Sequence, residues 1–175
     1  MQLRNAGLAL IAATLWLPQS AWSAATEKKS WEYLQVSSIK WHAYNQDALN
    51  QARQLNRPIF IFIFLNTCHW CHKYETETLE TSKISKRLKQ DYFPIAINSA
   101  KQPDLLKQLG VKAVPTTLLL TPDGRKIVKF QGFVDARDLG DILDANLFRW
   151  RKGEILDDEF GDPSVCCSLD TTPTK

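Results

Sequence analysis

The sequence predicts an α/β fold in which helices flank a central, mixed β-sheet. Segments with strand and helix character alternate along the chain. The apolar run from Ile59 to Leu65 lacks the polar alternation of a half-exposed strand, so it is expected to be buried on both faces in the middle of the sheet. A proline and a glycine in the turn at residues 121–124 predict an antiparallel hairpin, which makes the sheet mixed.

Local signals place the other elements around this central strand. Asn45 is a suitable N-cap for a helix that begins at Gln46, and Gly110 suits the end of a later helix. Gly132 and Asp135 introduce a final helix whose apolar side chains recur at helical spacing. The expected strands cover residues 39–44, 59–65, 93–97, 116–120 and 127–130, and the expected helices cover residues 46–55, 68–90, 104–109 and 135–150.

The first residues have the pattern of a cleavable secretory signal. Arg4 gives a positive start, Ala6 to Leu17 is apolar, and Ala21 and Ser23 are small residues ahead of a cut before Ala24. The apolar stretch is shorter than the ~20 residues that span a bilayer, which makes a permanent membrane anchor the less favoured alternative. We therefore expect an exported protein with four parts, namely a signal at 1–23, an N-terminal extension at 24–38, a domain at 39–150 and a C-terminal tail at 151–175.

Composition excludes several classes of function. The chain has 175 residues with 22 basic and 19 acidic side chains, and removal of Arg4 with the signal leaves 21 basic ones. No dense basic cluster suggests binding to nucleic acid. The length that remains suits one domain, which we expect to be monomeric and to work without a bound cofactor.

Two cysteines directly after the central strand point to redox chemistry. Cys68 and Cys71 are spaced as one helical turn would place them, so their side chains face each other if a helix begins here. Unpaired backbone N–H groups and the dipole at the start of a helix favour the thiolate form of Cys68. The thiolate is the attacking species in disulfide exchange.

The order of elements around this dithiol resembles the thioredoxin superfamily over residues 39–150, and the Cys-His-Trp-Cys-His sequence resembles thioredoxin-like proteins of bacterial export compartments. The resemblance implies thiol–disulfide exchange with protein substrates, in which Cys68 attacks and Cys71 resolves the mixed disulfide. It also implies a cis peptide bond before Pro115 and substrate pairing with the backbone of Val114. We expect a reductant in the bacterial periplasm, supplied by a membrane thiol relay, and keep an oxidase or isomerase as an alternative.

The two residues between the cysteines are candidates for substrate contact. His69 can stabilise a thiolate by its charge or by a hydrogen bond. The bulky indole of Trp70 shields the sulfur and contacts the partner, although a simple surface aromatic is the alternative reading. We therefore assign both residues to substrate binding.

One position departs from the superfamily pattern. Many thioredoxins carry a buried acid six residues before the first cysteine, where this chain has Phe62. His72 and Glu75 are possible replacements as proton acceptors for the resolving cysteine. An exposed Glu75 paired with Lys73 or Lys86 is at least as good an interpretation, so neither replacement is assigned a catalytic role.

The same motif allows two further readings. Cys68-x-x-Cys71-His72 satisfies the attachment pattern for c-type haem, but Met1 is the only methionine and is lost with the signal, which leaves His42 as a distant second ligand. The apolar strand before the motif also fits a cytochrome poorly. A redox-silent chaperone module would need a dithiol without a role.

A zinc site is the other metal alternative. It would combine the two cysteines of the motif with one of its histidines, and Cys166 or Cys167 would complete the ligand set. These last two cysteines are adjacent rather than spaced as zinc ligands usually are. They could instead form a vicinal disulfide, reach back to the dithiol as a relay, pair with another chain or be incidental.

Overall fold

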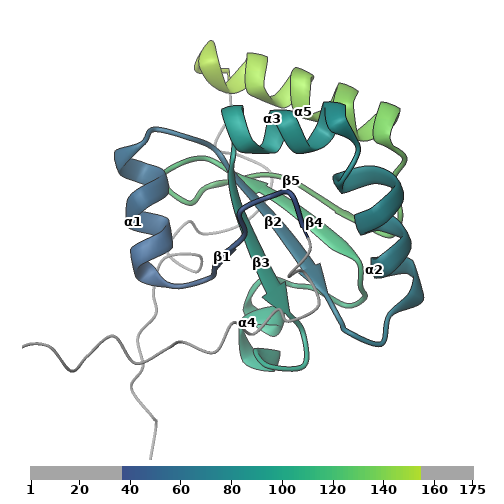
Figure 1. Cartoon of the computed structure of the whole chain (residues 1–175). Helices are drawn as coiled ribbons and strands as arrows, with labels where there is room; N and C mark the ends of the chain where they lie inside the picture. The colour runs from purple at the N-terminus through teal and green to yellow at the C-terminus, as the bar shows by residue number, and fades with distance from the viewer. Residues whose placement is uncertain (1–36, 155–175) are drawn as a thin grey trace, which may run out of the picture.

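A five-stranded mixed sheet forms the centre of the molecule. The computed structural model describes residues 37–154 (Figure 1). The strands lie in the order β1-β3-β2-β4-β5; β1, β3 and β2 are parallel, and β4 and β5 are antiparallel to their neighbours. This confirms the predicted mixed sheet and hairpin. The strands are β1 (His42–Ala43), β2 (Ile59–Phe64), β3 (Phe93–Asn98), β4 (Thr116–Leu120) and β5 (Lys126–Gln131).

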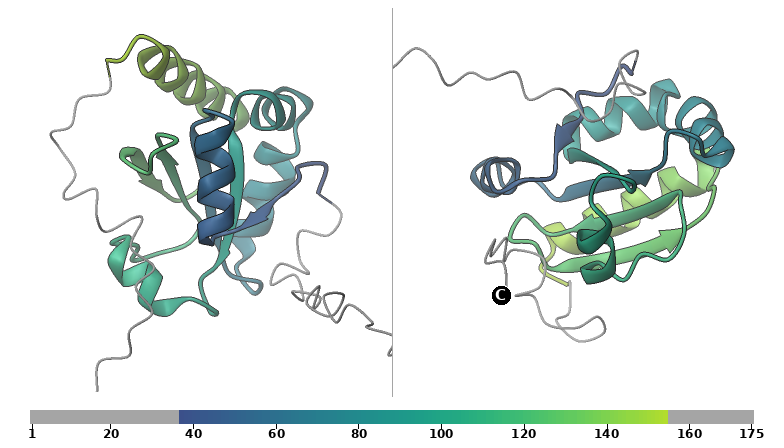
Figure 2. Two further views of the ribbon diagram at one scale, coloured as in Figure 1. Left: turned by 90° about the vertical axis from the view of Figure 1, so that its left-hand side faces the viewer. Right: turned by 90° about the horizontal axis from the view of Figure 1, so that it is seen from below.

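Helical segments cover both faces of the sheet. The even-numbered residues of β2 pack with α2, α3 and α5, and its odd-numbered residues pack with α1 and the residues around α4. Helices α3 and α5 lie side by side in both views (Figure 2). All six residues of β2 are buried, as its apolar run predicted. The segments are α1 (Gln46–Gln54), α2 (His69–Tyr74), the π-helical η2 (Glu75–Leu79), α3 (Ser82–Asp91), α4 (Pro103–Gln108) and α5 (Ala136–Arg151).

The predicted helix ends are confirmed by their hydrogen bonds. The Asn45 side chain accepts from the backbone N–H of Ala48 at 2.8 Å. Asp135 caps α5 by accepting from two backbone N–H groups at 2.9 Å. Gly110 follows α4 with a φ of +61°, a left-handed conformation that glycine adopts without steric cost. Within residues 37–154, no helix is both long and apolar enough to cross a membrane.

The first strand is much shorter than expected. Residues 39–44 were predicted as a strand, but only His42 and Ala43 pair with β3. The Ser37 hydroxyl accepts from the backbone N–H of Ile39 at 3.1 Å and from the indole N–H of Trp41 at 2.9 Å. These local bonds turn the chain before it reaches the sheet, and both apolar side chains enter the core instead.

The predicted continuous helix over residues 68–90 is wrong. It is divided into α2, η2 and α3, and the backbone N–H of Glu80 donates to the carbonyl of Glu75, five residues earlier. Thr78 donates its hydroxyl to the Val134 carbonyl at 2.7 Å, and Thr81 donates to the Thr78 carbonyl at 2.7 Å. Threonine side chains that bond to the backbone compete with the regular helical ladder, and here one of them ties the break to the loop before α5.

Candidate active site

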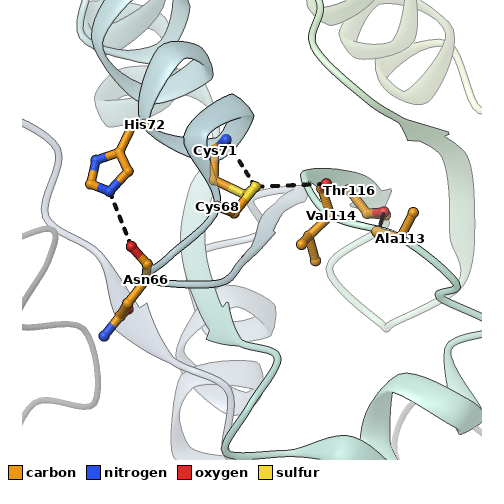
Figure 3. The surroundings of a disulfide bond; sticks show 7 residues. All are labelled: Asn66, Cys68, Cys71, His72, Ala113, Val114 and Thr116. Atoms are coloured by element: carbon orange, nitrogen blue, oxygen red, sulfur yellow. Dashed lines mark hydrogen bonds between the residues drawn. A yellow bond between two sulfur atoms is a disulfide. The ribbon is translucent and has the colours of Figure 1, made fainter.

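The dithiol lies where β2 ends and α2 begins. Cys68 is the N-cap of α2, with extended backbone angles of φ −84° and ψ 107°. Its Sγ accepts a hydrogen bond from the backbone N–H of Cys71 at 3.1 Å (Figure 3). The two residues form a disulfide with a Cα–Cα distance of 5.2 Å. Sequence spacing alone therefore located the pair correctly.

The two sulfurs differ in their access to solvent. Cys68 is partly exposed, whereas Cys71 is fully buried and belongs to the core between the sheet and α2. An incoming thiol or disulfide can therefore reach Cys68 and is screened from Cys71. When the pair is reduced, the N–H group that bonds to Cys68 Sγ stabilises a negative charge at the reachable sulfur.

The loop before β4 faces the dithiol. The Val114–Pro115 peptide bond is cis, as the resemblance implied. The Val114 carbonyl oxygen lies 3.8 Å from Cys68 Sγ (Figure 3). On the other side of the loop, the Gly132 backbone N–H donates to the Pro115 carbonyl at 2.8 Å. Segments that are 46 residues apart in sequence therefore meet at one sulfur.

An exposed aromatic surface lies beside the dithiol. Trp70 is 54% exposed, and its ring centroid lies 6.3 Å from that of Phe133, in the loop between β5 and α5. The Lys73 ammonium lies 5.3 Å from the Trp70 centroid and 5.2 Å from the Phe133 centroid, within the range of cation–π attraction. His69 is exposed, with its ring 5.9 Å from that of Trp70. Sequence reasoning missed Phe133, because no local signal places that loop near α2.

The interior beneath the dithiol is aromatic rather than acidic. Phe62 is fully buried, and its ring lies 5.8 Å from that of Trp41, 5.4 Å from that of Phe64 and 5.7 Å from that of Tyr74. The Tyr74 hydroxyl forms a 3.2 Å hydrogen bond with that of Thr117, and burial raises the Tyr74 pKa well above its usual value. This bond joins the dithiol helix to the strand that follows the cis-proline.

Glu75 and His72 lie in opposite environments. The expectation of an exposed Glu75 is wrong, because Glu75 is only 6% exposed. Lys73 pairs with Glu77 at 3.8 Å. Glu75 begins the π-helical segment and lies four residues after the buried Cys71, so both side chains are on the same face of the helix. His72 is exposed, and its Nε2 lies 3.1 Å from the Asn66 carbonyl oxygen, on the far side of α2 from Val114 (Figure 3).

Metal binding gains no support from the described residues. Across residues 37–154, no group of three or more His, Cys, Asp or Glu side chains is placed to hold a metal ion. The histidine that the haem and zinc readings share points to the Asn66 carbonyl. Cys166 and Cys167, which the zinc reading used, lie outside the described residues.

The fold and the dithiol beside a cis-proline define a thioredoxin-like protein. A family model with the short name Thioredox_DsbH, described as "Protein of unknown function, DUF255", matches residues 26–138. The chain belongs to this family.

Relatives and solved structures agree with this assignment. The chain is 32% identical to spermatogenesis-associated protein 20 of Homo sapiens over 92 aligned residues. The aligned region covers 51% of this chain and 12% of that protein. Over 133 residues the chain is 26% identical to the thiol:disulfide interchange protein DsbD of Yersinia enterocolitica, covering 73% of this chain and 23% of that protein. The chain thus spans a small part of the curated relatives that it matches.

Two solved structures share the fold at low sequence identity. A DsbH oxidoreductase superposes with a TM-score of 0.54 at 18% identity, over 63% of this chain and 85% of that one. A thioredoxin from Thermus thermophilus superposes with a TM-score of 0.59 at 18% identity, over 64% and 89% of the two chains. At this identity the likeness establishes the thioredoxin fold.

Proposed function

We propose that this protein is an exported thiol:disulfide oxidoreductase that reduces disulfides of protein substrates through Cys68 and Cys71. The observation that carries the proposal is the hydrogen bond from the Cys71 N–H to Cys68 Sγ, which stabilises a thiolate at the reachable sulfur. In this proposal a substrate backbone pairs with Val114, whose carbonyl oxygen lies 3.8 Å from that sulfur. Trp70 and His69 contact the substrate on the other side.

The reaction begins from the reduced dithiol. The Cys68 thiolate attacks one sulfur of the substrate disulfide, a bond forms between them, and the other substrate sulfur leaves as a thiolate that takes up a proton. Cys71 then loses its proton and attacks Cys68 Sγ, which releases the second substrate thiol. The product is the Cys68–Cys71 disulfide, the state found in this structure. Burial of Cys71 keeps it from competing for substrate in the first step.

Replacing Cys71 with serine tests this sequence of steps. The variant retains the attacking sulfur and lacks the resolving one, so mixed disulfides between Cys68 and protein substrates are expected to accumulate. Expression of the variant, acid quenching and non-reducing electrophoresis would reveal these adducts, and mass mapping would locate the bond. The Cys68→Ser/Cys71→Ser variant is the matched control, and both variants also carry Cys166→Ser and Cys167→Ser so that these cysteines contribute no thiol. Adducts that persist in the control, or no adduct in either variant, would contradict the proposal.

The deprotonation of Cys71 is the step in which we place Glu75. The carboxyl is buried one helical turn after Cys71, where Phe62 occupies the position of the usual acid. We expect Glu75→Gln to slow resolution of the mixed disulfide by about 10²-fold, the lower end of a general base's contribution. Single-turnover kinetics with a glutathione adduct at Cys68 measures this rate. Glu77→Gln, exposed on the same helix, is the control, and equal rates in both variants would remove Glu75 from the mechanism.

Export and the electron donor complete the proposal. The pattern at residues 1–23 is that of a cleaved signal, the extension at 24–38 leads to the domain at 39–150, and a tail follows at 151–175. An oxidising compartment such as the bacterial periplasm requires a donor that re-reduces the dithiol. Similarity to a protein named thiol:disulfide interchange protein DsbD supports exchange between thiol proteins, and the donor that we propose is a membrane thiol relay. Reconstitution with such a relay should reduce the Cys68–Cys71 disulfide, and no reduction would contradict this donor.

A further inference from the structure

A line of lysines follows the outer strand of the sheet. We call Lys112, Lys126 and Lys129 the lysine track. Lys129 donates to the Gly110 carbonyl at 2.9 Å, which binds β5 to the loop before β4. Burial lowers the Lys129 pKa, and the positive charges of Lys126 and Lys112 lower it further, so the three ammonium groups share one electrostatic neighbourhood.

The lysine track joins the two ends of the sheet. β4 begins next to the cis-proline and runs away from the dithiol, so the antiparallel β5 begins with Lys126 at the opposite end. Lys112 is exposed and stands two residues before Val114, whose carbonyl lies beside Cys68. The track therefore extends positive charge from the far end of the sheet to the active site.

The last helix delivers the C-terminal tail to the far end of this track. α5 starts after β5 near the dithiol and rises about 24 Å over its 16 residues. Its last residue, Arg151, pairs with Asp91 at 3.1 Å, directly before the start of β3 and therefore opposite the dithiol. The sequence that follows, residues 155–175, is acidic. Its only basic residue is Lys175, and its acidic residues are Asp157, Asp158, Glu159, Asp162 and Asp170.

We propose that the acidic segment 157–162 docks on the lysine track and holds Cys166 and Cys167 within reach of the Cys68–Cys71 disulfide. Cys166 is twelve residues after Glu154, a stretch that spans up to about 40 Å when extended, about twice the length of a six-residue strand. The negative charge of segment 157–162 complements the positive charge of the lysine track. The length of the chain between Glu154 and Cys166 allows the two cysteines to reach the dithiol. The inference rests on the proposed function, because it gives the dithiol a second partner within the same chain.

The exchange conserves atoms and electrons without another reactant. The Cys166 thiolate attacks Cys68 Sγ, the bond between Cys68 and Cys71 breaks, and Cys71 leaves as a thiolate that takes up a proton. Cys167 then loses its proton and attacks Cys166, which forms a disulfide between these two and releases Cys68 as a thiolate. The active-site pair is reduced as the tail pair is oxidised. The tail thereby serves as an in-chain thiol relay.

A two-cysteine version of the full chain tests the docking. In Cys71→Ser/Cys167→Ser only Cys68 and Cys166 remain, and the bond between them is equilibrated against glutathione and quantified by peptide mass mapping. We expect an effective concentration in the ~mM range of a tethered pair. Adding Lys112→Glu and Lys126→Glu should lower it at least tenfold, as should ~1 M salt, which shortens the Debye length to about 3 Å. Lys86→Glu/Lys89→Glu on exposed positions of α3 is the matched control and should leave it unchanged.

The outcomes separate this inference from the proposed function. The docking proposal is wrong, and the exchange activity stands, if Cys68 forms an adduct with glutathione but no bond with Cys166. The same conclusion follows if neither charge reversal nor salt changes the effective concentration for the Cys68–Cys166 bond. If Cys68 reacts with neither thiol, the proposed function fails as well. A bond that forms only between two chains, recognised by its dependence on protein concentration, also overturns in-chain docking.

Discussion

Replacing Cys68 with serine is expected to abolish disulfide exchange completely. Cys68 is the partly exposed sulfur of the pair, and Cys71 is fully buried, so the remaining thiol cannot take over the attack. The measurement is the redox equilibrium against glutathione, made in a Cys166→Ser/Cys167→Ser background so that the tail cannot contribute a second couple. That background should show one two-electron couple, and adding Cys68→Ser should remove it.

The position of this couple also tests the direction of electron flow. A reductant requires a potential nearer the ~−270 mV of thioredoxin than the ~−120 mV of DsbA, whose reduced form is strongly stabilised. A potential near that of DsbA would assign the protein to oxidation instead. Retention of a couple without Cys68, or an absorption band of haem in the same sample, would reject the dithiol mechanism itself. Cys68→Ser is conservative in volume, so unchanged thermal unfolding serves as the folding control.

Introducing the usual thioredoxin acid is expected to damage this protein severely. In Phe62→Asp the side chain loses its packing against Trp41, Phe64 and Tyr74. Truncating a buried Phe to Ala typically costs about 3–5 kcal/mol, and an unpaired buried carboxylate adds to that cost. We expect the free energy of unfolding to fall by at least ~4 kcal/mol. Urea unfolding followed by tryptophan fluorescence measures it.

A pH series distinguishes charge burial from the loss of packing. Burial raises the pKa of the introduced carboxyl in the folded state above its unfolded value of about 3.9. The folded state then binds more protons, so the variant is least destabilised at acidic pH and loses stability as pH rises. Phe62→Leu, which keeps an apolar side chain, is the control and should lack this dependence. An equal and pH-independent loss in both variants would show that the site accommodates an acid.

The alternation of elements and the dithiol were predictable because both are local. The continuous apolar run of β2 requires burial on both faces, and all six of its residues are buried. Asn45 and Asp135 satisfy the first N–H groups of their helices through bonds that span two or three residues. The spacing of Cys68 and Cys71 likewise needs only one helical turn. Each of these signals is complete within a few residues.

Interactions between distant segments explain the predictions that were wrong. Residues 68–90 have the pattern of one helix, yet Thr78 bonds to Val134, 56 residues away, at the point where the helix is divided. We expected Glu75 on the surface beside Lys73, but the fold covers the helix face that carries both Cys71 and Glu75. Neither effect leaves a trace in local spacing. Both depend on which loop packs against the helix.

The amino-acid sequence by itself determined the order of strands and helices, the central buried strand and the position of the reactive cysteine pair, because periodicity, capping and helix geometry act over a few residues. Only the tertiary structure decided what surrounds that pair. It brought Val114 to Cys68, set Phe133 against Trp70 and buried Glu75. These contacts form because the pairing of the strands brings together loops that are distant in sequence. Such packing depends on the whole chain and not on any local segment.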